Sequence, residues 1–290
     1  MLLFKNVLPL SIAGLCMLVA ASSSVCAKDP DFRPGTDPGG LAITLIGSGI
    51  DYTNRDISKR LARDGEGTPI GWDFVDGNHK PFAEPDGEST NAGMETVKAL
   101  LSSYKSSRLI VVRADVNNAS SMAQALAMAS KMPGAIIAVP KLPDADGWKL
   151  ITAVAEHAPK KLFVVPASPE WGDKAIPENI VRAAPFDQWA SLHGPAVDVW
   201  MTKPGAGLFG DLIVRGGAAA NGQGPDPVQL AVARAAANAA CAQHSLEVPL
   251  VTGKAAKDAF LKLARPSKLR PGVMVHDPLC LYGGQLLKGR

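Results

Sequence analysis

The sequence has 290 residues, of which 47% are hydrophobic, 20% are charged and 6% are aromatic. This composition is typical of an ordinary soluble α/β protein and excludes the disordered and fibrous classes, and the length suffices for one large core or two small ones. The formal net charge of +3 is small and the basic residues are scattered, so we expect no nucleic-acid partner.

The first 27 residues have the features of a cleavable export signal. Lys5 supplies a positive charge, residues 7–21 form an apolar run, and small residues at 25–27 suit cleavage after Ala27. The run is shorter than the roughly 20 residues that a membrane-spanning helix needs, which favours cleavage over anchoring. Lipid attachment through Cys26 is a weaker alternative, because the preceding residues are a poor lead-in to a lipidated cysteine. We therefore expect an exported mature chain, periplasmic or secreted, without a membrane span.

Residues 28–40 are rich in Asp, Pro and Gly and are predicted to be an extended lead-in to a domain over residues 41–290. The strands are predicted at residues 42–46, 72–75, 109–112, 135–139, 162–165, 180–183, 197–200 and 212–214. The helices are predicted at residues 56–63, 90–103, 120–131, 147–157, 225–243 and 254–263, with an irregular C-terminal end. This alternation predicts a single α/β domain in which a mostly parallel sheet is covered by helices on both faces.

Two of the four cysteines, Cys16 and Cys26, leave with the signal, so Cys241 and Cys280 remain. An even pair in an oxidising compartment is a disulfide candidate, and we predict this bond over the alternative of two separate buried thiols. The five histidines are scattered and no Cys-x-x-Cys or His-x-x-x-His occurs. We therefore expect no metal site and no cofactor.

Residues 43–57 read Ile-Thr-Leu-Ile-Gly-Ser-Gly-Ile-Asp-Tyr-Thr-Asn-Arg-Asp-Ile, an apolar strand that breaks into a polar turn. Chemistry in open α/β sheets gathers at such carboxyl ends of strands. The stretch resembles the first active-site segment of the subtilisin-like serine peptidases, the subtilases, in which the strand is followed by Asp-Ser/Thr-Gly. Ser48, Gly49 and Asp51 suit that pattern, but Gly47 replaces the catalytic aspartate.

Two further segments resemble parts of the subtilase scaffold. Residues 189–199, Trp-Ala-Ser-Leu-His-Gly-Pro-Ala-Val-Asp-Val, are similar to the family's Ala-Ser-Phe-Ser-x-x-Gly-Pro-x-Val-Asp-Val segment. Residues 71–75, Gly-Trp-Asp-Phe-Val, are similar to a phrase that is common at this point in the family. The resemblance spans residues 41–243 in order, and it implies a single-domain subtilisin-like fold.

The family's base segment, His-Gly-Thr-His-Val-Ala-Gly, corresponds to residues 86–93, Asp-Gly-Glu-Ser-Thr-Asn-Ala-Gly. Alignment on the Asp-Gly pair puts Glu88 at the histidine position, and alignment on the Ala-Gly pair puts Gly87 there. Glu88 resembles the glutamate base of the related sedolisins, but we favour a solvated acid in the first turn of a helix. The nearest histidine, His79, is predicted to be a surface residue.

The nucleophile segment, Gly-Thr-Ser-Met-Ala-Ser-Pro in the family, corresponds to residues 221–227, Asn-Gly-Gln-Gly-Pro-Asp-Pro. Depending on the alignment, Gly224 or Gln223 stands at the serine position, and no Ser, Thr or Cys occurs in residues 215–240. The oxyanion asparagine is replaced by Pro169, or by Ser168 with a gap. Proline donates no hydrogen bond, and we interpret Ser168 as a turn residue.

Subtilases bind a peptide by adding it as a strand to the edge after their Asn-Met-Ser-Leu-Gly segment, with main chain paired to main chain. The equivalent residues 136–143, Ile-Ile-Ala-Val-Pro-Lys-Leu-Pro, contain two prolines, which remove ladder donors from such an edge. We therefore do not expect peptide docking in the family's manner.

Together these substitutions imply an exported, non-catalytic pseudoprotease that acts as a binding or structural module in the cell envelope. Its expected partner is a protein, a peptide or an envelope component. The alternative is a serine endopeptidase with a displaced site that uses Glu88, Ser89 or Ser168. Nucleotide binding through residues 47–49 is a weaker hypothesis, because Tyr52 occupies the third glycine position of the dinucleotide fingerprint.

Overall fold

The computed structural model describes residues 29–84, 88–143, 147–168, 171, 175–185, 199–201, 226–245, 251–266 and 274–276. Side chains are described in these ranges except at residues 88–91, 199–201, 265–266 and 274–276. The predicted signal over residues 1–27 and the predicted strand over residues 212–214 lie outside the described residues, and both stay predictions.

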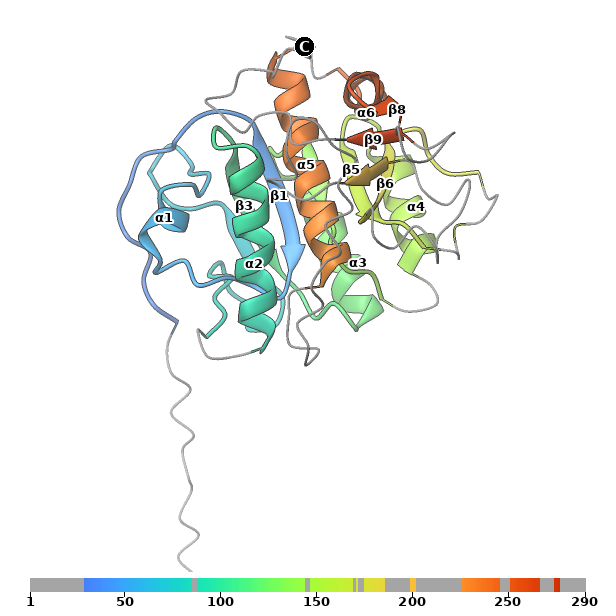
Figure 1. The fold of residues 1–290 in the computed structure, drawn as a ribbon. Helices are drawn as coiled ribbons and strands as arrows, with labels where there is room; N and C mark the ends of the chain where they lie inside the picture. The colour runs from blue at the N-terminus through green and yellow to red at the C-terminus, as the bar shows by residue number, and fades with distance from the viewer. Residues whose placement is uncertain are drawn as a thin grey trace, which may run out of the picture.

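One sheet runs through the described residues, with the strand order β2-β3-β1-β4-β5-β6-β7-β9-β8 (Figure 1). Every neighbouring pair is parallel except β8 and β9, which are antiparallel. The strands are β1 (Ala42–Gly47), β2 (Gly71–Asp73), β3 (Arg108–Arg113), β4 (Ile136–Ala138), β5 (Leu162–Pro166), β6 (Ile180–Pro185), β7 (Val199–Met201), β8 (Arg265–Pro266) and β9 (Met274–His276). The mostly parallel sheet is the one that the sequence predicts.

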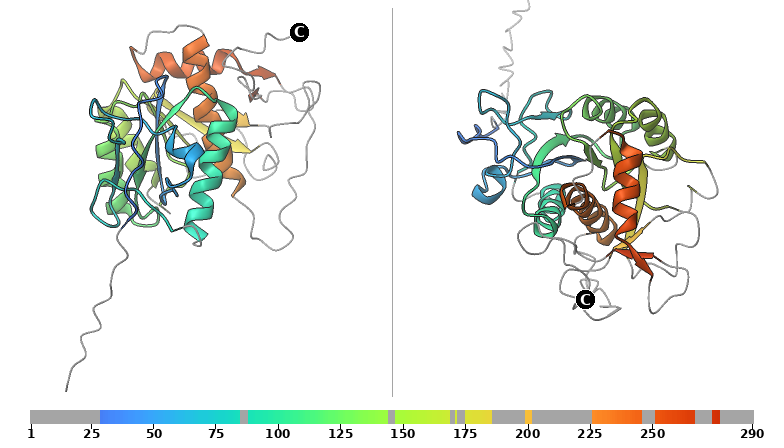
Figure 2. Two further views of the ribbon diagram at one scale, coloured as in Figure 1. Left: turned by 90° about the vertical axis from the view of Figure 1, so that its left-hand side faces the viewer. Right: turned by 90° about the horizontal axis from the view of Figure 1, so that it is seen from above.

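Helices cover both faces of this sheet (Figures 1 and 2). The helices are α1 (Arg55–Ser58), α2 (Glu88–Ser103), α3 (Ala119–Ala129), α4 (Gly147–His157), α5 (Pro227–Ser245) and α6 (Gly253–Lys262). Helices α2, α5 and α6 pack on one face and α3 and α4 on the other, each over its own apolar core. The predicted α/β class is therefore confirmed.

Strand β5 shows how one apolar run supplies both cores. Leu162 and Val164 lie in the core under α2, α5 and α6, while Phe163 and Val165 lie in the core under α3 and α4. Successive side chains of a strand point to opposite faces, so a strand that is buried on both sides needs apolar residues at every position. This is why a central strand such as β5 can be recognised in the sequence as an unbroken apolar run.

Three elements differ from the sequence prediction, each because of a specific contact. The helix predicted over residues 56–63 ends at Ser58, because Leu61 and Arg63 form bridges to Leu109 and Pro69. Strand β2 ends at Asp73 instead of residue 75, because that carboxylate accepts the next free backbone N–H groups and turns the chain. The C-terminal end, predicted to be irregular, contributes the short strands β8 and β9 to the sheet.

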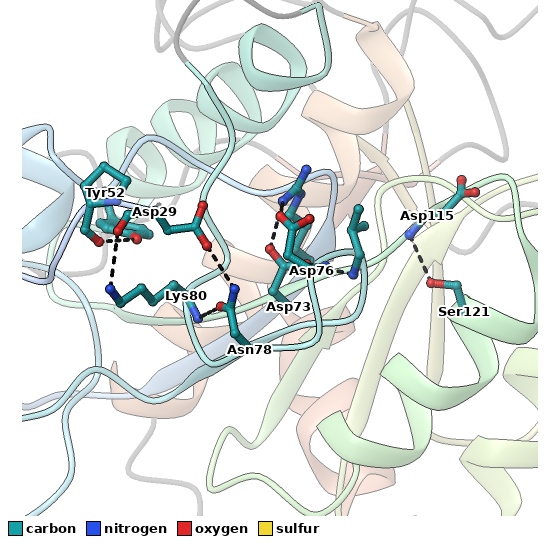
Figure 3. Close-up of polar contacts among 11 residues, drawn as sticks. Asp29, Tyr52, Asp73, Asp76, Asn78, Lys80, Asp115 and Ser121 are labelled. Atoms are coloured by element: carbon teal, nitrogen blue, oxygen red, sulfur yellow. Dashed lines mark hydrogen bonds and ion pairs between the residues drawn. The ribbon is translucent and has the colours of Figure 1, made fainter. Parts of the chain in front are cut away.

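The lead-in to the domain is tied to its body, and we call residues 29–37 the N-terminal strap. The hydroxyl of Tyr52 donates to Pro30 O at 2.7 Å, and the rings of Phe32 and Tyr52 lie 4.5 Å apart. Figure 3 shows Asn78 and Lys80 reaching toward Asp29, with Asn78 Nδ2 at 2.9 Å from Asp29 Oδ2. Because these contacts join the strap to the turn after β1 and to the loop before α2, the strap helps to fix both segments.

Asp37 anchors the other end of the strap. Its carboxylate accepts hydrogen bonds from Arg63 N at 2.8 Å, Gly39 N at 2.7 Å and Arg108 Nη1 at 2.6 Å. Burial raises the pKa of Asp37, but these hydrogen bonds and the charge of Arg108 outweigh it and lower the pKa below its ordinary value of 3.8. The folded state is therefore favoured while this carboxyl is ionised.

We expect the stability that Asp37 contributes to be present above about pH 5 and to decline as the pH falls through the ordinary carboxyl range, because a group with a lowered pKa stabilises the fold only in its charged form. Urea unfolding of the wild type and of Asp37→Asn should differ more at pH 6.5 than at pH 3.5. Asp56→Asn is the control, because the Asp56 side chain is 94% exposed. A gap between wild type and Asp37→Asn that does not change with pH would contradict this assignment.

No helix in the described part of the chain is long and apolar enough to cross a membrane.

Candidate functional site

A cleft with a volume of about 240 Å³ opens at the carboxyl ends of β1 and β4. Gly47 and Ser48 line it where β1 ends, and Lys141 lines it beyond β4. Ala92 from α2 and Gln229 from the first turn of α5 complete the surround. The cleft therefore joins segments that lie far apart in the sequence, at the edge of the sheet where ligands of α/β proteins bind.

The walls of the cleft are partly apolar and partly polar. Leu45, Ile46, Ala92, Val116 and Pro140 supply the apolar part. Ser48, Thr96, Asn117, Lys141 and Gln229 supply the polar part. Lys141 is the one charged side chain among these residues, and it is exposed to solvent.

The turn after β1 is built around two glycines. Gly49 has φ +93°, a left-handed conformation that side-chain-bearing residues rarely adopt. A Cβ added at Gly93 would lie 2.0 Å from Gly49 O, so only glycine lets α2 approach the turn this closely. Gly47 is different, because a Cβ there would meet no atom of the described residues within 4 Å. The local packing would thus admit a side chain at Gly47.

An ion pair supports this turn from beneath. Arg113 at the end of β3 donates through Nη1 to Asp73 Oδ2 at 2.9 Å, and the Asp73 side chain is fully buried. Arg113 also pairs with Asp76 (Figure 3 shows both acids). Burial by itself lowers the pKa of Arg113, but the two carboxylates raise it, so the guanidinium stays charged. Since Arg113 Cδ lies within 2.8 Å of a Cβ built at Gly49, this side chain runs directly under the turn.

Tyr52 is the buried phenol nearest to the turn, and it does not act as a base. Burial, followed by the charges of Asp29, Asp31, Asp73 and Asp51, raises its pKa well above the ordinary value. The hydroxyl therefore stays protonated and donates a hydrogen bond to the carbonyl of Pro30 in the strap. Its role is structural.

The described residues place part of the predicted site. Gly47 lies at the end of β1 and lines the cleft, and its role as the first vacated catalytic position stays a prediction. Glu88 is the first residue of α2, but its side chain and that of Ser89 are outside the described set. Gly224, Pro169 and Cys280 lie outside the described residues, so their roles stay predictions.

The structure describes the surroundings of three other residues that the sequence analysis singled out. His79 is exposed, with its ring 6.1 Å from that of Phe32, which confirms that it is a surface residue. Ser168 is half-buried after β5, and its carbonyl accepts a hydrogen bond from Trp171 N at 3.1 Å, as in a turn. Cys241 is buried on α5 with Sγ 3.7 Å from Ser245 Oγ. Its bond to Cys280 remains a prediction.

The sequence did not single out Asn117, Lys141 and Gln229 as cleft residues. The one available signal was position, because Asn117 and Lys141 follow the ends of parallel strands and Gln229 begins a helix. Within the described ranges, no group of three or more His, Cys, Asp or Glu side chains is arranged to hold a metal ion.

Comparison with solved structures identifies the fold. A cold-adapted subtilisin-like serine proteinase superimposes with a TM-score of 0.56 at 15% identity, over 87% of this chain and 93% of that one. The nisin leader peptidase NisP from Lactococcus lactis gives 0.55 at 11% identity, over 86% and 89% of the two chains. MycP1 with its N-terminal propeptide removed gives 0.52 at 15% identity, over 87% and 93%.

In sequence, no protein-family model matches the chain and no curated protein matches it. The structural likeness nevertheless covers most of both chains, so the fold is subtilisin-like, as the resemblance of the sequence segments implies.

Proposed function

We propose that this chain, which has the subtilisin-like fold, is an exported pseudoprotease that binds a ligand in the cleft without cleaving it. The observation that carries the proposal is the position of Gly47. It stands where β1 ends, beside the starts of α2 and α5, and it brings no side chain to the place where the family carries its catalytic aspartate. Among the described residues, no atom lies within 4 Å of a Cβ built at Gly47, so steric conflict does not explain why a glycine replaces the family's aspartate there.

The packing of α2 bears on the second vacated position. Helix α2 contacts the turn after β1 at Gly93, and at Met94, whose Sδ lies 3.3 Å from Asp51 N. The contact at Gly93 supports the alignment anchored on the Ala-Gly pair, in which Gly87 and not Glu88 stands in place of the histidine. Neither residue offers an imidazole, so the proton acceptor of the family's mechanism has no counterpart here.

The third position, that of the nucleophile, falls in residues 221–225, which lie outside the described residues. Residues 215–240 contain no Ser, Thr or Cys, and they include the start of α5, which lines the cleft. A nucleophile would therefore have to come from another segment.

The alternative of a displaced peptidase has two hydroxyls to draw on inside the cleft. The hydroxyl of Thr96 donates to Ala92 O at 2.7 Å, and its residue is buried. Ser48 is more accessible, and Lys141 is the one lining side chain that could serve as its base. Catalytic lysine bases are typically buried, and Lys141 is exposed. The non-catalytic function is the better supported one.

We expect a serine-directed fluorophosphonate probe to leave the mature protein unlabelled, because an unactivated serine hydroxyl is a weak nucleophile. Intact-mass spectrometry after incubation with the probe measures this, with active subtilisin as the positive control. Stoichiometric labelling would overturn the proposal. Loss of that labelling in Ser48→Ala, Ser89→Ala or Ser168→Ala would then identify the displaced nucleophile.

A further inference from the structure

We propose that the cleft recognises the free C-terminal carboxylate of a peptide whose last residue is apolar. This inference rests on the proposed function and names the ligand class for the same site. The ligand should combine an apolar body with an anionic end, because the described lining of the cleft has an apolar wall and one charged side chain, Lys141.

The charge of Lys141 is available to a ligand. No carboxylate among the described side chains forms an ion pair with it, and the described acids next to the lining residues have other partners: Glu95 pairs with Lys98 at 2.7 Å, and Asp226 Oδ1 accepts from Val228 N at 2.9 Å. Asp51 Oδ1 accepts from Thr53 N at 2.9 Å, and Asp115 Oδ1 accepts from Asn117 N at 3.0 Å. None of these acids is among the lining residues, so an anion entering the cleft meets a cation there.

Two side-chain amides among the lining residues add hydrogen-bond donors. Asn117 follows β3 and is exposed, and Gln229 lies in the first turn of α5 and is half-buried. A carboxylate has two oxygens that accept several hydrogen bonds, and charge-assisted bonds of this kind are stronger than neutral ones. Helix α3 also begins at this edge, with the neutral Asn118 as its N-cap, so its positive end favours a negative group. The start of α5 already has the carboxylate of Asp226, which accepts from Val228 N at 2.9 Å.

The size and the edge of the cleft favour a chain end over an internal peptide segment. Its volume of about 240 Å³ matches roughly eight water molecules at about 30 Å³ each, enough for one or two residues. Pro140, which follows β4 and lines the cleft, has no N–H to pair with an added strand. A peptide that ends in the cleft needs no such ladder, because its terminal carboxylate supplies the anchoring contacts.

The test uses the mature protein and two fluorescein-labelled pentapeptide libraries. Both libraries have Leu as the last residue and the same sequences otherwise. One library ends in a free carboxylate and the other in a carboxamide. Fluorescence anisotropy should show about fivefold tighter binding of the carboxylate library, the upper range for one partly exposed ion pair. Raising the salt concentration from 50 to 300 mM should narrow this difference.

Lys141→Gln should remove the preference for the carboxylate, while Lys131→Gln should keep it. Lys131 is an exposed lysine beyond the C-terminal end of α3, away from the cleft residues, so it controls for a general loss of positive charge. Both substitutions are at exposed positions, and matching thermal unfolding curves will show that both variants fold.

Equal affinity for the two libraries, or a preference that survives Lys141→Gln, would overturn the inference and leave the proposed function standing. Absence of binding of both libraries would also overturn it, with the probe-labelling experiment then deciding the proposed function separately. Displacement of the peptide by isovalerate at equal affinity would show a site for small free carboxylates and not for peptide ends. Cleavage of either library would refute the proposed function itself.

Discussion

Gly93→Ala is expected to destabilise the protein by about 3 kcal/mol, the upper range for forcing an extra methyl group into a packed site. The new Cβ would lie 2.0 Å from Gly49 O and 3.5 Å from Ser48 Oγ. Both contacts are with the turn after β1, and the backbone oxygen cannot move aside without moving that turn. The gain of about 1 kcal/mol that alanine normally brings to a helix interior is too small to offset this clash.

Urea unfolding followed by circular dichroism measures the loss, read as a lower midpoint with an unchanged slope. Gly47→Ala is the matched control, because it adds the same methyl group two residues from Gly49 where no atom of the described residues lies within 4 Å. We expect the control to stay within about 0.5 kcal/mol of wild type. A Gly93→Ala protein as stable as the wild type would mean that α2 does not pack on the turn as described.

Asp73→Ala is expected to cost about 3–5 kcal/mol, the range for breaking a buried ion pair by removing one partner. The side chain of Asp73 is fully buried, and Arg113 would lose its closest buried counter-charge. Two backbone donors would also lose their acceptor, since Val75 N and Asp76 N lie 2.7 and 3.0 Å from Asp73 Oδ1. The end of β2 and the turn above Arg113 should loosen together.

The control for this substitution is Asp76→Ala, which removes the other partner of Arg113. The side chain of Asp76 is 45% exposed, so we expect a loss of no more than about 1 kcal/mol. The double variant Asp73→Ala/Arg113→Met should be less destabilised than the sum of its two single variants, because the unpaired buried charge is then absent. Additive losses would show that the ion pair does not couple β2 to β3.

Both substitutions act on the same small region, the turn that begins at Gly47. The turn is held from one side by α2 through Gly93 and from beneath by Arg113. A site that binds without chemistry still needs its walls in fixed positions, and these contacts supply that rigidity. The proposed loss of a catalytic group at Gly47 would therefore leave a turn whose supports remain.

The N-terminal strap extends the same support. Tyr52 links the strap to Phe82, whose ring lies 5.2 Å from its own, and Phe82 forms a bridge with Ile50 next to the turn. The lead-in that composition alone predicts as merely extended is therefore part of the packing around the cleft. Composition could not reveal this, because the partners of the strap are tens of residues away in the sequence.

The sequence by itself determined the alternation of strands and helices, and it determined that a glycine, Gly47, follows the first strand. Buried parallel strands such as β5 must be apolar on both faces, so they are recognisable without knowledge of their neighbours. The absence of a carboxylate at Gly47 is likewise a fact of the sequence. To recognise this absence, one needs to know only that the residue lies at the end of a predicted strand.

Only the tertiary structure decided that β8 and β9 join the sheet and which residues form the cleft. Strand β9 exists because Val275 pairs with Trp200, and the cleft exists because the sheet order brings Lys141 and Gln229 to the end of β1. Such features depend on contacts between segments that are distant in the chain. Local residue preferences do not encode those contacts, because the same loop sequence serves as well in any sheet order.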